Sequence, residues 1–120
     1  MLIKGLRMVN FRQYKDVKLE FSSDEKKNIT LVMGDNGTGK TTLAQAFRWC
    51  LYGVTDFEIA EVINRKVRDK MVPGGRDKVV VEMEVEYNDK EYVISREQVF
   101  SKKQIKVESQ NSVQRIYYKE

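Results

Sequence analysis

Residues 32–47, VMGDNGTGKTTLAQAF, contain the pattern G-x-x-x-x-G-K-[ST] at positions 34–41 without a mismatch. This pattern is typical of a loop that binds nucleotide phosphates. The run before it, residues 29–33, is apolar and suits a strand buried on both faces. After it, apolar side chains recur at helical spacing from about Lys40 to Tyr52, at Leu43, Ala46, Phe47, Cys50 and Leu51, and Gly53 is placed to end the helix. We therefore expect a strand, a phosphate-binding loop and a helix in succession.

The positions of the loop have distinct expected roles. Glycines let the backbone curl around an anion, and the free N–H groups at the start of the helix carry a partial positive charge. Lys40 is expected to reach the β- and γ-phosphates, Thr41 to ligate Mg²⁺, and Thr42 to add a contact on the α-phosphate side. The expected nucleotide-binding residues of the loop are Gly34, Asp35, Asn36, Gly37, Thr38, Gly39, Lys40, Thr41 and Thr42.

The composition limits the class of protein. A chain of 120 residues with 41% hydrophobic and 33% charged residues has the length and composition of one globular domain. A single cysteine, Cys50, excludes an internal disulfide and favours a reducing, cytoplasmic setting. The absence of histidine excludes histidine-based catalysis and histidine metal ligands. No apolar run approaches the roughly 18 residues of a membrane-spanning helix, so we expect no membrane partner.

The remainder of the chain indicates a mixed α/β fold. Residues 2–11 and 17–21 read as two antiparallel strands, and residues 56–70 as a short helix and a basic loop. Pro73-Gly74-Gly75 marks a break that divides the chain into a P-loop core, residues 1–72, and an antiparallel β subdomain, residues 73–120. After the break the period becomes two, and residues 88–91, NDKE, suggest a hairpin turn. The strand candidates 91–100, 104–109 and 113–119, with turns at SKK and QN, predict an antiparallel meander.

Three stretches together resemble a known family. They are LRMVNFRQY (6–14), NITLVMGDNGTGKTTLAQAFRWCLYG (28–53) and VVVEMEVEYNDKEYVISRE (79–97), and they look like the N-terminal head segment of SMC/SbcC/RecF-type ATPases, with the DNA-sulfur-modification ATPase DndD as a close variant. The resemblance implies ATP as the nucleotide. It also implies that Arg12, of the motif N-F-R, lies near the nucleotide and that Asn36 faces the γ-phosphate side, where a second head closes.

The resemblance also implies partners. In this family, hydrolysis needs a Walker B strand and a Ser-Gly-Gly signature from a C-terminal half, together with a second head. Neither motif is present here, so no catalytic residue is assigned, and we expect the chain to be an N-terminal piece of a longer protein that acts on DNA, with a nuclease or another repair or defence subunit as a further partner. Glu82, Glu84 and Glu86 alternate with apolar residues, so VVVEME is interpreted as one solvated strand face rather than a Walker B strand. The glutamines of the predicted meander, Gln98, Gln104, Gln110 and Gln114, are not expected to act at the nucleotide.

Two other functions are compatible with the motif. One is a small stand-alone P-loop nucleotide kinase or GTPase, although no N-K-x-D guanine motif and no second parallel βα unit is evident. The other is a non-catalytic, nucleotide-gated binding module, in which a basic surface of the last strands would contact DNA or a protein. That surface would hold Lys102, Lys103, Lys106, Arg115 and Lys119, although such a run of charge more often serves solubility.

Overall fold

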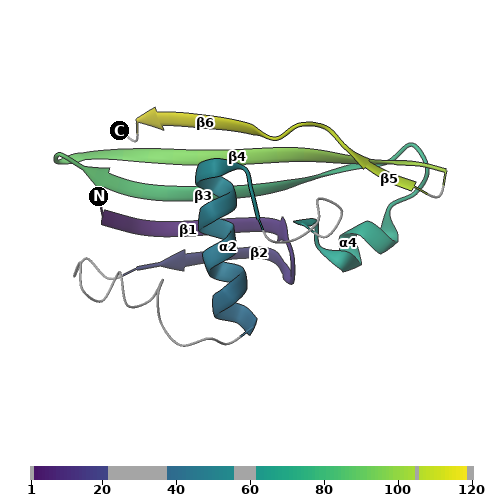
Figure 1. Cartoon of the computed structure of the whole chain (residues 1–120), viewed down its shortest axis with the longest axis horizontal. Coiled ribbons are helices and arrows are strands. Elements are labelled where there is room, and N and C mark those ends of the chain that lie inside the picture. The colour runs from purple at the N-terminus through teal and green to yellow at the C-terminus, as the bar shows by residue number, and fades with distance from the viewer. Residues whose placement is uncertain (1, 22–37, 56–61, 105, 119–120) are drawn as a thin grey trace.

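Six antiparallel strands form one sheet, and a long helix crosses it (Figure 1). The computed structural model describes residues 2–21, 38–55, 62–104 and 106–118, with the side chains of residues 38–42 and 106 outside that description. Its elements are β1 (Leu2–Phe11), β2 (Tyr14–Glu20), α2 (Thr38–Tyr52), α4 (Arg65–Lys70), β3 (Arg76–Tyr87), β4 (Lys90–Lys103), β5 (Lys106–Ser109) and β6 (Val113–Tyr118). The mixed α/β class predicted from the sequence is confirmed. The predicted strand at residues 29–33 and the loop residues Gly34 to Gly37 lie outside the described residues.

The sheet joins the two halves of the chain. Its order is β2-β1-β3-β4-β5, so β1 pairs with β2 on one side and with β3 on the other. The predicted pairing of the first two strands is confirmed, with Met8 opposite Val17 and Leu6 opposite Leu19. Because β1 also pairs with β3, from Leu2 opposite Glu86 to Val9 opposite Val80, the sheet extends across the predicted break at Pro73.

The predicted meander is wrong in one respect. β6 does not pair with β5 but with β4, and β5 pairs with another part of the same strand. β4 is 14 residues long, so residues 100–103 accommodate the short β5 and residues 92–97 accommodate β6. The predicted turn at residues 101–103 is also wrong, because these residues continue β4. The chain reverses at Gln104, whose φ is 55°.

Alternation along β3 follows the prediction. Val79, Val81, Met83 and Val85 are buried, while the glutamates between them lie on the opposite, half-exposed face. There, Glu84 pairs with Lys18 and Glu86 with Lys4. The interpretation of these glutamates as a solvated strand face is therefore confirmed. Tyr87 is an exception, because it lies at the hairpin and is 55% exposed.

Tight turns lie on both sides of β3. Asn88 and Asp89 both have positive φ, 51° and 61°, as the two central residues of a type I′ hairpin require, and Tyr87 lies opposite Lys90. Before β3, the Gly75 N–H donates to the Val72 carbonyl at 2.8 Å, and Gly74 adopts φ 84°. The predicted hairpin is confirmed, and residues 72–75 form a tight turn before β3.

Helix α2 covers one face of the sheet. Ala46, Phe47 and Cys50 are buried as predicted, and the cluster they form includes Leu6 and Met83 of the sheet. The buried face of α2 is wider than the sequence predicts, because Trp49 is also buried. Its ring packs on Phe11 with the centroids 5.8 Å apart. None of the described helices is long and apolar enough to cross a membrane.

The interior position of Cys50 predicts an unreactive thiol. Its sulfur lies 3.3 Å from the carbonyl oxygens of both Val81 and Ile94, and burial raises the pKa of the thiol to about 12. At pH 8.5 we expect no labelling of the folded chain by iodoacetamide and full labelling in guanidinium chloride, measured by mass spectrometry. Because the pKa is higher in the folded chain, the unfolded thiol ionises first at alkaline pH, and stability should fall as the pH rises above 9. Rapid labelling under native conditions would contradict the burial of this residue.

Candidate nucleotide site

The described part of the phosphate-binding loop forms the start of α2. Residues 38–42, which include Lys40 and the two threonines that follow it, are the first residues of this 15-residue helix. The first turn carries no acidic residue, so nothing in it neutralises the partial positive charge of the helix N-terminus. The backbone therefore has the form that an anion site at a helix start requires.

The opposite end of α2 is held by the sheet. The Arg96 Nε donates to the Cys50 carbonyl at 3.2 Å, and the Gln114 Nε2 donates to the carbonyls of Cys50 and Leu51 at 3.0 Å. Arg96 and Gln114 lie opposite each other on β4 and β6. They satisfy carbonyls that have no partner within a helix, and the guanidinium complements the negative end of the helix dipole.

Gly53 ends the helix as predicted. It has φ 73°, and its N–H donates to the Trp49 carbonyl at 2.7 Å. A Cβ at this position would lie 2.9 Å from a terminal nitrogen of Arg96. Glycine is thus required both by the backbone conformation and by the close approach of Arg96.

Arg12 lies in the tight turn between β1 and β2. Its φ is 50°, an uncommon value for a residue other than glycine, and its N–H donates to the Val62 carbonyl at 2.8 Å. On the other side of Phe11, the Asn64 N–H donates to the Asn10 carbonyl at 2.7 Å, and Phe11 itself forms a β-bridge with Ile63. Main-chain hydrogen bonds therefore fix this turn to the segment that leads into α4.

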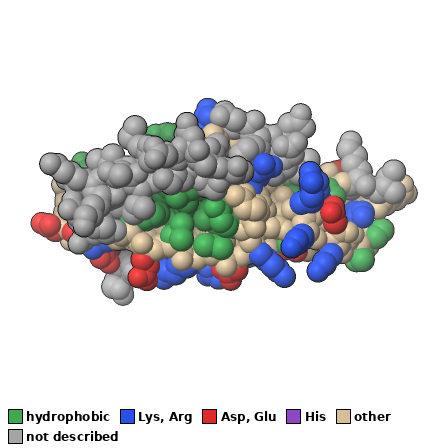
Figure 2. Space-filling view, turned by 90° about the horizontal axis from the view of Figure 1, so that it is seen from below, with side chains coloured by type: hydrophobic (Ala, Val, Ile, Leu, Met, Phe, Trp, Pro, Cys, Tyr) green, Lys and Arg blue, Asp and Glu red, His purple; other side chains and the backbone are tan. Residues whose placement is uncertain are grey.

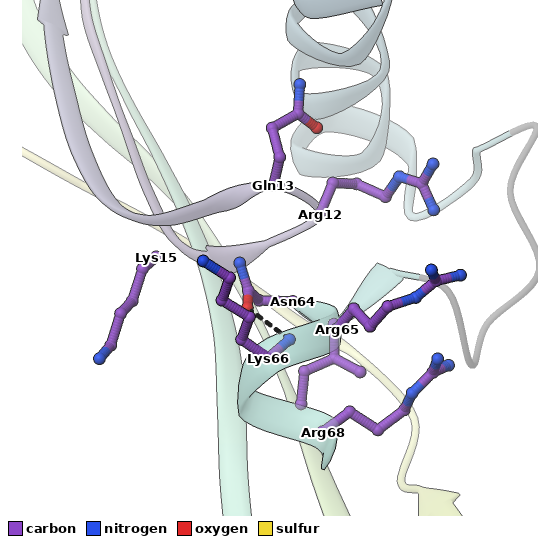
Figure 3. A pocket seen from close by; sticks show the side chains of 8 residues that line it. Arg12, Gln13, Lys15, Asn64, Arg65, Lys66 and Arg68 are labelled. Atoms are coloured by element: carbon purple, nitrogen blue, oxygen red, sulfur yellow. Dashed lines mark hydrogen bonds between the residues drawn. The ribbon is translucent and has the colours of Figure 1, made fainter. Parts of the chain in front are cut away.

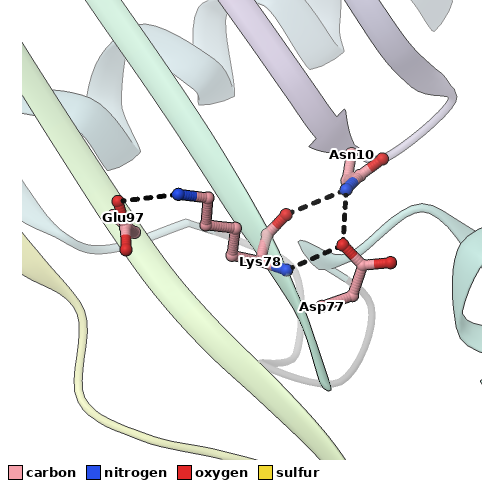
Figure 4. A network of polar contacts seen from close by, with 4 residues as sticks. All are labelled: Asn10, Asp77, Lys78 and Glu97. Carbon is pink, nitrogen blue, oxygen red and sulfur yellow. Dashed lines mark hydrogen bonds and ion pairs between the residues drawn. The ribbon is translucent and has the colours of Figure 1, made fainter. Parts of the chain in front are cut away.

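Asn10 holds the same turn from the sheet side (Figure 4). It adopts φ 56°, and its Nδ2 donates to the Asp77 carboxylate at 3.1 Å and to the Lys78 carbonyl at 2.9 Å. Asp77 also accepts from the Lys78 N–H, and the Lys78 ammonium pairs with Glu97. Asparagine tolerates a left-handed backbone better than most residues. The backbone conformation therefore explains why asparagine suits the first position of the motif N-F-R.

A cationic cleft opens between this turn and α4 (Figure 3). It has a volume of about 690 Å³ and is lined by Arg12, Gln13, Lys15, Ile63, Asn64, Arg65, Lys66 and Arg68. Figure 3 shows the guanidinium groups of Arg12, Arg65 and Arg68 pointing to the same side. No carboxylate is among the described residues that line the cleft, so its chemistry suits an anion.

Asn64 sets the direction of α4. It is 5% exposed, and its side-chain oxygen accepts from the N–H groups of Lys66 and Val67 at 3.0 and 3.2 Å. This N-cap starts the helix directly after the bridge to the β1–β2 turn. Arg65 and Arg68 are three residues apart, so they lie on one face of α4. Their guanidinium groups point to the same side as that of Arg12.

Sequence reasoning finds Arg12 but does not assign its neighbours. The stretch NRKVRDK, residues 64–70, reads in the sequence only as part of a short helix and a basic loop, and the structure shows that its basic part is the helix. An asparagine followed by a basic helical turn is the available signal for the cap. Of the glutamines noted in the sequence, Gln98 donates to the Gln110 carbonyl, and Gln114 donates to carbonyls at the end of α2.

Removal of the Asn10 side chain should destabilise the turn. Asn10→Ala loses two hydrogen bonds and places alanine at positive φ, so we expect the free energy of unfolding to fall by about 2 kcal/mol. Asn10→Gly is the matched variant, because it loses the same hydrogen bonds but tolerates the backbone. Urea denaturation followed by circular dichroism measures both, and Asn10→Gly should be intermediate. Wild-type stability in the alanine variant would show that the network contributes nothing.

Comparison with known proteins identifies the family. The AAA domain family matches residues 6–120 of the chain. The DNA double-strand break repair Rad50 ATPase of Methanocaldococcus jannaschii is 30% identical over 98 residues, which are 81% of this chain and 8% of that protein. The DNA replication and repair protein RecF of Agathobacter rectalis is 38% identical over 95 residues, which are 78% of this chain and 23% of that protein.

A third relative is named for a retron rather than for DNA repair. The retron Vc95 probable ATPase of Vibrio cholerae is 36% identical over 69 residues, which are 56% of this chain and 13% of that protein. The chain spans less than a quarter of the length of each of these three relatives. It belongs to the AAA domain family and is an N-terminal ATPase segment of the SMC, RecF and Rad50 type.

Proposed function

We propose that this chain binds Mg·ATP through residues 34–42 and supplies the phosphate-binding part of an ATPase head that acts on DNA in repair or defence. The observation that supports the proposal most directly is the family match, which covers the loop and both flanking regions. The helical start of α2 at Thr38 is consistent with it, because a P-loop leads directly into a helix. The stand-alone kinase or GTPase is not favoured, since the relatives are Rad50, RecF and a retron ATPase.

Different residues of the loop would contact different parts of the nucleotide. The main-chain N–H groups of Gly34, Asp35, Gly37, Thr38 and Gly39 would surround the phosphate oxygens. Lys40 would hold the β- and γ-phosphates, Thr41 would ligate Mg²⁺ and Thr42 would contact the α-phosphate side, with Asn36 facing the γ-phosphate. The bound magnesium would neutralise phosphate charge.

Arg12 would lie beside this site, at the rim of the cationic cleft. Its turn is fixed by the hydrogen bond to Val62 and by the Asn10 network, so the main chain that carries its side chain is held before a ligand arrives. A preorganised cation loses less conformational freedom on binding an anion than a mobile one does. Arg12 would thus contribute binding rather than bond cleavage.

Hydrolysis would require further parts. A C-terminal half of the head would supply the Walker B carboxylates and the signature, and a second head would complete the composite site. Two of the relatives are named for DNA double-strand break repair and for DNA replication and repair, and these names support DNA as the substrate. A repair or defence subunit, such as a nuclease, would be a further partner. A cytoplasmic location of the complete protein would be consistent with these roles.

Binding of Mg·ATP tests the proposal. Lys40→Ala removes a charge-assisted contact, so we expect the dissociation constant of a fluorescent ATP analogue to rise at least about tenfold. Lys90→Ala, on the β3–β4 hairpin and outside the phosphate-binding motif, is the matched control and should bind as the wild type does. The chain alone should turn over ATP negligibly. Unchanged affinity in Lys40→Ala, or rapid turnover that depends on Lys40, would contradict the proposed function.

A further inference from the structure

We propose that Arg96, Ser112 and Gln114 are positioning residues for nucleotide binding, which act from the far end of α2. These three residues, here called the α2 clamp, hold the last turn of the helix, and the first turn of the same helix belongs to the phosphate-binding motif. This role rests on the proposed function and deepens it, because the clamp would reach the nucleotide only through α2.

Directional bonds join the clamp to the helix. The Arg96 Nε and the Gln114 Nε2 both donate to the Cys50 carbonyl, at 3.2 and 3.0 Å, and the same amide donates to the Leu51 carbonyl at 3.0 Å. The guanidinium also donates from Nη1 to the Ser112 hydroxyl at 2.9 Å, which fixes its orientation. Apolar packing is non-directional and allows packed helices to slide by small amounts, whereas a hydrogen bond weakens steeply when its angle changes. The clamp therefore fixes the helix along its axis.

The sheet brings the members of the clamp together. Arg96 and Gln114 lie opposite each other on β4 and β6, and both side chains reach the face that carries α2. Gly53, directly after the helix, leaves room for the guanidinium, since a Cβ there would lie 2.9 Å from its Nη1. The Cys50 sulfur anchors the same turn from the interior, 3.3 Å from the Val81 carbonyl oxygen. Two strands and the core thus hold one helical turn.

Helix α2 carries the position of its last turn to its first. After Gly39 it contains neither glycine nor proline, the residues at which helices most often bend, and a rise of about 1.5 Å per residue places roughly 18 Å between Thr38 and Cys50. Figure 1 shows the helix crossing the sheet toward β4, and Figure 2 views the molecule from the side at which the helix begins, opposite the clamp. Binding groups must be held within about 0.5 Å of their working positions, so a small shift at the clamp should disturb the phosphate site.

Variants of the clamp and of a matched position separate positioning from stability. Arg96→Met and Gln114→Met keep the approximate length of the side chain and remove the donors. Gln98→Met is the control, because Gln98 lies on the same strand, is buried and donates to the Gln110 carbonyl rather than to α2. Affinity of the full chain for the fluorescent ATP analogue is measured with Mg²⁺, together with the free energy of unfolding in urea.

We expect each clamp variant to bind the analogue about fivefold more weakly while the chain stays folded, and the control to lose stability without losing affinity. Because both clamp side chains bind the Cys50 carbonyl, the double variant should weaken binding less than the two single effects multiplied together. Arg96→Lys keeps one cationic donor and should recover part of the affinity. Unchanged affinity in both methionine variants, or an equal loss in Gln98→Met, would overturn the proposal.

A reciprocal measurement needs no variant. If the clamp strengthens ATP binding, ATP must strengthen the clamp by the same factor. Exchange of the Arg96 Nε proton with solvent, followed by NMR on the ¹⁵N-labelled chain, should therefore slow about fivefold when Mg·ATP is added. A clamp that serves stability alone would exchange at the same rate with and without nucleotide, and this result would also refute the proposal.

Lys40→Ala distinguishes failure of this proposal from failure of the proposed function. If Lys40→Ala weakens binding while the clamp variants do not, and ATP leaves the Arg96 exchange unchanged, the clamp has no positioning role and the function stands. If Lys40→Ala binds the analogue as the wild type does, the proposed function fails and the clamp proposal fails with it.

Discussion

Burial of α2 against the sheet is the interaction on which the rest of the structure depends. Its apolar face, with Phe47, Trp49 and Cys50, joins the buried side of the sheet in one core. Each large side chain buried in this way contributes about 1.5–3 kcal/mol. Because the phosphate-binding motif runs into the first turn of the same helix, packing in the middle of α2 also sets the position of that end. Arg96 and Gln114 hold the other end, so β4 and β6 determine where the helix stops.

A second constraint joins the start of the chain to its middle. The β1–β2 turn would be a mobile hairpin end, but two left-handed residues, Asn10 and Arg12, direct its main chain toward residues 62–64. Uncommon backbone angles persist where the surroundings compensate for them, and here hydrogen bonds on both sides of Phe11 do so. As a result, the turn and α4 together present guanidinium groups to one side.

Charge is arranged differently on the two parts of the surface. Across the face of the sheet opposite α2, cations and carboxylates are interleaved, which favours solubility and adds little to stability because exposed pairs are weak. Around α4, cations are grouped, and no carboxylate is among the described residues of the first cleft. Such grouping costs some stability in the free protein and lowers the free energy when a polyanion binds.

Local sequence determined much of this protein. The loop pattern, the period of two in β3, the Asn-Asp hairpin and the terminal Gly53 depend on residues that are close along the chain, so spacing alone predicts them. Only the tertiary structure decided the burial of Trp49, the return of β6 to β4, the binding of Arg96 and Gln114 to α2, and the alignment of Arg65 and Arg68 with Arg12. These features join residues dozens of positions apart, as Gln114 and Cys50 are. No local period records such interactions, because they form only when the sheet brings distant segments together.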